Sequence, residues 1–322
     1  MRKGKLTPEE LQRLIFDIIK SRREEVRLHA GIGEDCAALL CEDYILVTTD
    51  PITTKCNNPG GLAIHINAND IAASGGEPLA VTMTILAPTD ATTREIDIIM
   101  KEAESTASEL GIEIIGGHTE FTDAVNRFVI SCTMLGRVKT LIGGTGSNPG
   151  DSIIMTKYAA IEGTLILADM YPQYVREDSD AIQWMKNNLS VMNEGRIVHD
   201  LDITAMHDIT EGGVLGAVSE MCNLRQNGAE IDISLIPIKP VTKKLTDMLN
   251  LNPYQLLSSG SMLITSNEPD KIIDALKAQG IKGTIVGTIN DSGIVTARYN
   301  DHIETVNVEA DEIFKVNEDK KL

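Results

Sequence analysis

Aromatic side chains and positive charge are both scarce in this chain of 322 residues. It holds 1 Trp, 6 Tyr and 4 Phe, and 29 Lys and Arg against 47 Asp and Glu, a formal charge of −18. Such a charge repels phosphate backbones and anionic lipids, and so few rings supply no platform for stacked bases. We therefore expect no nucleic acid and no membrane as partners, and we expect aliphatic cores.

Cysteines are few and scattered, and long apolar runs are missing. The five cysteines form no C-x-x-C pair, which argues against a zinc site and against a disulfide framework. No stretch reaches the roughly 18 uncharged apolar residues of a membrane span, and acidic residues precede any apolar run of signal length. The sequence therefore predicts a soluble, cytoplasmic protein with reduced, mostly buried thiols.

The length predicts two domains, at a prior of about 150 residues each. Residues 143–150 read Gly-Gly-Thr-Gly-Ser-Asn-Pro-Gly, the longest cluster of chain breakers in the sequence. We place the domain boundary there, with domains at residues 1–147 and 148–322. No fixed-period repeat and no low-complexity tract is found.

Local patterns predict helices and strands in both halves. Capping boxes open one helix at Thr7 and another at Thr92, which runs to Leu110. Residues 36–41 and 44–49 are short apolar runs on either side of an acidic turn and predict a strand pair. Further segments are expected as a helix over 62–74, strands over 112–115, 128–135, 152–156 and 284–289, and helices over 161–170 and 270–279.

Several aspartates lie at positions typical of sites, at strand ends, on a helix or beside glycines. They are Asp35, Asp50, Asp70 and Asp208. An acidic protein that handles a nucleotide needs a divalent cation between its carboxylates and the phosphates, and Mg²⁺ is held by a few such oxygens. Each position also has an ordinary structural reading, as a turn or a strand end. Asp70 is the strongest of them, because a carboxylate within an Ala- and Ile-rich helix costs desolvation unless it is paired.

Two glycine-containing segments are candidates for phosphate or metal binding. Residues 116–120, Gly-Gly-His-Thr-Glu, follow a predicted strand, although an ordinary hairpin has the same pattern. Residues 207–213 lead into a helix whose N–H groups attract anions, and Gly212 and Gly213 let a ligand approach the backbone. Neither a P-loop nor a dinucleotide-binding glycine motif is present.

Taken in order, these motifs resemble the ATP-dependent superfamily of aminoimidazole ribonucleotide (AIR) synthetase, selenophosphate synthetase, thiamine-monophosphate kinase and the hydrogenase maturation protein HypE. The resemblance covers nearly the whole chain. The ordered set is specific although each member is short. It consists of Gly31-Ile-Gly-Glu-Asp-Cys-Ala37, Thr49-Asp50, Asn69-Asp-Ile-Ala72, Gly116-Gly-His-Thr119, Pro149-Gly-Asp151 and Asp208-x-Thr210-x-Gly212-Gly213.

The resemblance implies an α+β, two-domain AIR synthetase-like fold. Its N-terminal domain forms a shared, barrel-like sheet in a homodimer, and an α/β domain follows. ATP and Mg²⁺ are the implied cofactors, and a small molecule is the implied substrate. The implied metal ligands are Asp35, Asp50 and Asp70, the implied bases are His118 and Glu120, and the implied nucleotide- or substrate-binding residues are Asn69, Gly117, Thr119, Asp208, Thr210, Gly212 and Gly213.

Differences between this sequence and the superfamily's motifs indicate which branch of the superfamily it resembles most. His118 stands where the HypE-like and thiamine-phosphate-kinase branches usually carry Asp, which puts one metal ligand in doubt. The first cysteine, Cys36, follows the metal-type Asp35, which argues against a selenophosphate synthetase. The HypE-like branch is nearest. HypE proteins carry a reactive cysteine in a C-terminal tail, and no cysteine follows Cys222 here, so the thiocyanate-forming reaction is expected to be absent.

Two functions from different classes remain open at this point. The first is an enzyme that uses Mg·ATP to phosphorylate or dehydrate a small oxygen-bearing substrate, mainly by positioning and charge neutralisation. The second is an ATP-binding accessory protein that docks a maturation partner protein. Release of ADP in response to a metabolite discriminates between them.

Overall fold

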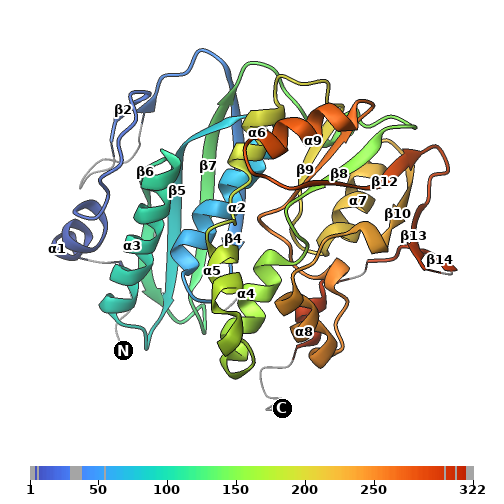
Figure 1. Cartoon of the computed structure of the whole chain (residues 1–322). Coiled ribbons are helices and arrows are strands. Elements are labelled where there is room, and N and C mark those ends of the chain that lie inside the picture. The colour runs from blue at the N-terminus through green and yellow to red at the C-terminus, as the bar shows by residue number, and fades with distance from the viewer. Residues whose placement is uncertain are drawn as a thin grey trace. The chain divides into compact units, whose positions relative to one another are not determined.

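The computed structural model describes residues 4–5, 7–29, 38–53, 56–300, 302–308 and 310–316. The chain divides into two compact units, here called unit 1 (residues 1–71 and 76–139) and unit 2 (residues 72–75 and 140–322). The mixture of helices and largely antiparallel sheets (Figure 1) is the expected α+β class. No helix in the described ranges has the length and apolarity needed to cross a membrane.

Unit 1 is built on a five-stranded sheet with the order β1-β6-β5-β7-β4. Its strands are β1 (Gly4–Lys5), β4 (Tyr44–Ile52), β5 (Glu77–Pro88), β6 (Glu113–Thr122) and β7 (Val129–Val138). Only β5 and β6 run parallel. A parallel pair needs a crossover, and helix α3 (Thr93–Leu110) supplies it. Alternation along β5 and β7 buries one face of the sheet, from which Met83, Cys132 and Met134 project into the core.

Two helices of unit 1 pack closely against one another. They are α3 and α2 (Pro59–Ala73), and a Cβ on Gly60 of α2 would lie 2.1 Å from the backbone oxygen of Ile99 in α3. The predicted capping box of α3 is confirmed, because Thr92 Oγ1 accepts from Glu95 N and the Glu95 carboxylate accepts from Thr92 N. Gly111 ends this helix in the left-handed conformation.

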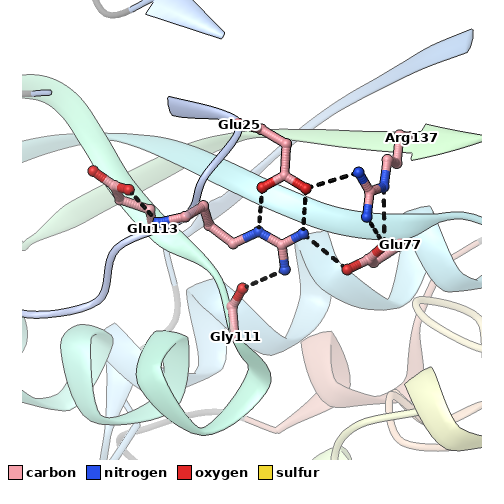
Figure 2. Close-up of polar contacts among 6 residues, drawn as sticks. Glu25, Glu77, Gly111, Glu113 and Arg137 are labelled. Carbon is pink, nitrogen blue, oxygen red and sulfur yellow. Dashed lines mark hydrogen bonds and ion pairs between the residues drawn. The ribbon is translucent and has the colours of Figure 1, made fainter. Parts of the chain in front are cut away.

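A network of charges fastens the segment before β2 (Val26–Leu28) onto the sheet of unit 1 (Figure 2). The Arg23 guanidinium binds the Glu25 carboxylate at 2.9 and 3.0 Å and the Glu77 carboxylate at 2.9 Å. Arg137 of β7 binds the same two carboxylates, at 2.7 and 2.8 Å. The two arginines therefore share the two glutamates, so that each guanidinium contacts both carboxylates.

Unit 2 contains a seven-stranded sheet with the order β14-β13-β10-β12-β8-β11-β9. The strands are β8 (Ser152–Thr156), β9 (Ala205–Asp208), β10 (Gly228–Asp232), β11 (Met262–Ser266), β12 (Gly283–Asn290), β13 (Val295–Tyr299) and β14 (His302–Thr305). Apolar residues from the central strands enter two buried clusters. One cluster includes α7 (Gly213–Asn223), and the other includes α6 (Met192–Val198) and α9 (Pro269–Ala278).

The remaining helices of unit 2 are α4 (Ile161–Met170), α5 (Ser179–Lys186) and α8 (Pro240–Leu249), and α4 contacts both of the others. Residues 72–75, the end of α2 and the turn after it, belong to unit 2. There Ala72 and Ala73 pack with Val191 and Val198.

Several predicted elements were wrong in detail. The expected strand pair over 36–41 and 44–49 does not form, because β3 (Ala38–Leu39) pairs with β2 and β4 pairs with β7. The first helix, capped by Thr7 and Glu10 as expected, is short: α1 (Pro8–Leu11) continues as a π-helical turn to Phe16. The segment 116–120 is no hairpin but lies inside β6. The strand expected over 284–289 is β12, and two further strands, β13 and β14, extend the sheet beyond the predicted elements.

Candidate functional site

Strand β4 and helix α2 bring two predicted metal ligands, Asp50 and Asp70, onto one face of the sheet. Thr48 and Asp50 alternate on β4 and point the same way. Thr48 Oγ1 donates to Asp70 Oδ2 at 2.5 Å, and Asp50 N donates to Asn67 Oδ1 at 3.0 Å. Because Asn67 and Asp70 lie one helical turn apart, the strand and the helix run side by side through this contact.

The amide of Asn67 is fully buried and makes three bonds. It also donates to the carbonyl of Ala63 at 2.9 Å and to that of Asp50 at 3.4 Å. Asn67 therefore fixes the backbone of Asp50 without using the Asp50 carboxylate. The side chains of Asp50 and Asp70 are only partly buried, so their oxygens remain accessible.

The predicted bases, His118 and Glu120, lie on the other face of the same sheet. They alternate with Thr119 and Phe121, which are buried on the helix-facing side of β6. His118 Nε2 is 3.4 Å from Glu120 Oε2, and both side chains are about one-third exposed, at 39% and 31%. The imidazole and the carboxylate thus lie side by side on an accessible surface.

Strand register shows how far apart these groups lie. Asp50 pairs with Cys132, Cys132 with Met83, and Met83 with Gly117. Three strand spacings of roughly 4.8 Å place Gly117 about 14 Å from Asp50. A Cβ on Gly117 would lie 1.8 Å from Met83 O, so glycine is required there by packing within the sheet. Within unit 1, the structure therefore brings Asp50 and Asp70 together but not Gly117, His118 or Glu120 with them.

Three more predicted residues complete this part of the site. Asn69 is fully buried in α2, and Thr119 is 7% exposed on the helix-facing side of β6. Asp35 lies outside the described residues. Two carboxylates beside a threonine and an asparagine form a hard oxygen donor set, which suits a Mg²⁺ ion that keeps waters and phosphate oxygens as its other ligands. A closed cage of three or more His, Cys, Asp or Glu ligands is not found within the described ranges.

In unit 2, the predicted residues Asp208, Thr210, Gly212 and Gly213 lie where β9 passes into α7. Gly212 adopts the left-handed conformation with φ of +82°, and Gly213 has φ of +62°. The loop that precedes β11 packs against this joint, because Ser258 N donates to Thr210 O and Ile209 N donates to Ser261 O. Residues 258–261, Ser-Ser-Gly-Ser, are therefore neighbours of the glycine joint.

The amide of Gly212 is already bonded to a carboxylate of the same chain. Gly212 N donates to Asp311 Oδ2 at 2.7 Å, and Ile313 N donates to the other oxygen of Asp311 at 2.8 Å. Asp311 is 1% exposed, and burial raises its pKa in spite of these donors. The anion-accepting end of α7, predicted as a phosphate contact, thus holds an internal carboxylate.

Sequence reasoning missed two charged groups beside this joint. His207 Nε2 binds Glu220 Oε2 at 2.9 Å, and its Nδ1 lies 3.8 Å from Asp208 Oδ1. Burial alone would lower the pKa of His207, but the carboxylates of Asp208 and Glu220 outweigh this effect and raise the pKa to about 9. Burial raises the pKa of Glu162 in α4 to about 7, and one of its oxygens has no hydrogen-bond partner. His207 lies in the segment 207–213 that the sequence singled out, but its partner Glu220 is 13 residues away, and Glu162 belongs to no motif, so no sequence signal identified either role.

Comparisons with known proteins give the same family for both halves. Residues 33–138 match the model of the AIR synthase related protein, N-terminal domain, and residues 148–300 match that of its C-terminal domain. A hydrogenase expression/formation protein of Methanocaldococcus jannaschii is 27% identical, over 92% of this chain and 96% of its own length. The carbamoyl dehydratase HypE of Cupriavidus necator is 22% identical, over 87% of this chain and 83% of its own length.

Solved structures share the fold across nearly the whole chain. The HypE of E. coli superposes with a TM-score of 0.81 at 20% identity, covering 94% of this chain and 98% of that one. A HypE in complex with ATP gives a TM-score of 0.80 at 16% identity, covering 96% of both chains. A thiamine-monophosphate kinase of Stenotrophomonas maltophilia gives 0.73 at 18% identity, covering 92% of this chain and 98% of that one.

Proposed function

The chain belongs to the AIR synthase related family and is HypE-like, and from this premise we propose that it uses Mg·ATP to phosphorylate or dehydrate a small oxygen-bearing substrate. The names of its relatives support an ATP-driven reaction, since they include a carbamoyl dehydratase and a selenide, water dikinase. One observation on this chain carries the proposal further: Asp50 and Asp70 lie on one face, fixed by Asn67 and Thr48 but still accessible.

In this proposal the chain supplies position and charge rather than a covalent nucleophile. Asp50 and Asp70 would hold Mg²⁺, which neutralises phosphate charge when it is bound. The Thr48 hydroxyl orients the Asp70 carboxylate, and the Asn67 amide holds the backbone of Asp50. His118, paired with Glu120, would exchange a proton at Nε2 with a substrate on the uncovered face.

The uncovered face of the sheet in unit 1 supports a homodimer. The uncovered face of the sheet carries His118 and also exposes apolar side chains of the edge strand β4, with Ile45 at 47% and Val47 at 63% exposure. An open edge strand with apolar side chains is a template for association. We propose that a second copy packs on this face.

The experiment that tests the function measures release of ADP from Mg·ATP. Purified protein is incubated with phosphate- and amide-bearing metabolites, one at a time, and ADP is quantified. We expect at least one metabolite to raise ADP release above that of the protein alone. Binding of Mg·ATP without release of ADP for any metabolite would overturn the enzymatic proposal and favour the accessory one.

The accessory function remains the second candidate because of one solved complex. A HypE bound to HypF superposes with a TM-score of 0.71 at 20% identity, covering 84% of this chain and 92% of that one. A partner protein of the maturation type is therefore proposed alongside the small-molecule substrate. Localisation in the cytoplasm stays a prediction of the sequence.

A further inference from the structure

Four side chains of unit 2 form a cluster of rings and ammonium groups, here called the Lys–aromatic cluster. Tyr158 follows β8, Trp184 lies in α5, Lys239 immediately precedes α8 and Lys282 immediately precedes β12, all elements labelled in Figure 1. The rings of Tyr158 and Trp184 meet edge to face with their centroids 5.3 Å apart. The proposed reaction uses none of these residues.

Both lysines lie over the rings of the cluster. Lys239 Nζ is 4.4 Å from the ring centroid of Tyr158 and 3.8 Å from that of Trp184. Lys282 Nζ is 5.1 Å from the ring centroid of Tyr158. The face of an aromatic ring attracts a cation, more strongly where water is excluded. This attraction gathers two positive charges around one tyrosine.

Backbone hydrogen bonds fix the segments that carry these side chains. Lys157 N donates to the carbonyl of Lys282 at 2.8 Å, and Ala159 N donates to that of Pro237 at 2.9 Å. Ser261 Oγ donates to the carbonyl of Tyr158 at 2.6 Å. A cluster held in this way loses little conformational freedom when it binds something, which favours recognition of a ligand.

The cluster presents donors that lack acceptors. Across the described part of the chain, neither Lys239 nor Lys282 forms an ion pair, although acidic residues far outnumber basic ones. In the same residues, the Trp184 Nε1–H and the Tyr158 hydroxyl make no hydrogen bond. Ammonium and indole N–H groups can only donate. Burial and the nearby charge of Lys282 lower the pKa of Lys239, and no carboxylate in the described part of the chain pairs with either ammonium group.

We propose that the Lys–aromatic cluster binds the oxyanion group, carboxylate or phosphate, of a small-molecule ligand. An anion there accepts from several donors and relieves the repulsion between the two ammonium groups. The two rings and Lys239 are half-buried, and Lys282 is exposed. If this ligand is the substrate of the proposed reaction, that substrate carries a negative charge, and this identification rests on the proposed function. The existence of the anion site does not depend on the proposed function.

Trp184 makes the test direct, because it is the only tryptophan in the chain. The fluorescence of the full-length protein is followed while inorganic phosphate or malonate is added, with the ionic strength held constant by sodium chloride. We expect a saturable change in Trp184 emission with at least one of the two anions. Saturation by phosphate alone, by malonate alone or by both identifies the class of the ligand.

Variants tie the signal to the cluster. Lys239→Gln and Lys282→Gln are each expected to lower the affinity for the anion by about tenfold, which corresponds to the loss of one charge-assisted hydrogen bond of about 1.4 kcal/mol. Lys243→Gln and Lys271→Gln are matched controls, since these lysines are exposed and paired with Asp247 and Glu268. Should Lys239→Gln fail to fold, Lys282→Gln decides, because the Lys282 side chain is exposed.

A non-saturable change equal to that with chloride, or equal affinity in Lys282→Gln and the controls, would overturn the proposal. The titration contains no ATP, so its result is independent of ADP release. Anion binding without release of ADP would refute the proposed function but support this site. Release of ADP without anion binding would support the proposed function but refute this site.

Discussion

Asp70 and Thr48 form the shortest contact between α2 and β4, and the proposed cofactor depends on it. We expect Asp50→Asn and Asp70→Asn each to weaken Mg·ATP binding by at least tenfold, because each removes one anionic ligand while leaving the core volume unchanged. Thr48→Val removes only the donor that orients Asp70 and is expected to cost roughly tenfold.

Titration calorimetry with Mg·ATP measures these effects. Asp97→Asn is the control, since Asp97 lies on α3 and pairs with the exposed Lys101. Unchanged affinity in both Asp50→Asn and Asp70→Asn would remove these residues from the metal site.

Glu162 makes the stability of unit 2 depend on pH. Its pKa is raised to about 7 from an ordinary 4.5, so the folded state holds a proton that the unfolded state releases. The stability of unit 2 should therefore fall as the pH rises from about 4.5 to 7, by roughly 3 kcal/mol. Glu162→Gln should abolish this part of the loss, while the part that comes from His207, whose pKa is raised to about 9, remains.

Urea unfolding followed by Trp184 fluorescence at pH 5.5 and pH 8 tests this, because Trp184 lies in unit 2. Glu268→Gln serves as the control, as that carboxylate is solvent-exposed beside Lys271. An equal difference between the two pH values in the native chain and in Glu162→Gln would contradict the assignment.

Among the elements, the segment before β2 is attached to unit 1 mainly by charge. Glu77 is partly buried, yet the two arginines outweigh burial and lower its pKa, and Arg23 lowers that of Glu25 (Figure 2). Lowered carboxyl pKa values stabilise the fold above the ordinary value of about 4.5, and this contribution is lost as the pH falls below it. The attachment should therefore weaken in acid.

Glu77→Gln is expected to release the segment at neutral pH, because it leaves Arg137 and Arg23 with one carboxylate between them. Amide hydrogen exchange of residues 20–29 at pH 7 should quicken by roughly tenfold, for a cost of about 1.4 kcal/mol. Glu268→Gln again serves as control. Unaltered exchange would contradict this prediction. It would show that Glu104, which accepts from Lys20 N, Ser21 N and Ser21 Oγ, and Glu113, which accepts from Arg23 N, hold the segment without Glu77.

Local signals predicted the elements well and their pairing poorly. The capping box at Thr92 and Glu95 was readable because it is complete within four residues. The strand pair at 36–49 was wrong, because register between β4 and β7 is set by residues 78 to 94 positions apart. The acids of the site were readable as motifs, but the sheet face on which His118 lies follows from the whole alternation of β6, including its irregular register at Gly116.

At the scale of the whole molecule, the homodimer is the main prediction. A mass measurement by light scattering at micromolar concentration should give twice the 35.0 kDa of one chain. Val47→Lys places a charge on the exposed edge strand and should yield monomers. Leu235→Lys, at an exposed apolar position of unit 2, is the control and should remain dimeric. A monomeric native chain would sink the prediction.

The end of α2 has a consequence for the timing of synthesis. Ala72 and Ala73 emerge from the ribosome early, yet the residues that bury them, such as Val191 and Ile264, follow more than a hundred codons later. At about 5–20 residues per second, these alanines wait at least several seconds for their partners. Residues 72–75 therefore become buried only when the later residues of unit 2 fold. A nascent chain arrested before residue 191 should leave residues 72–75 accessible to protease.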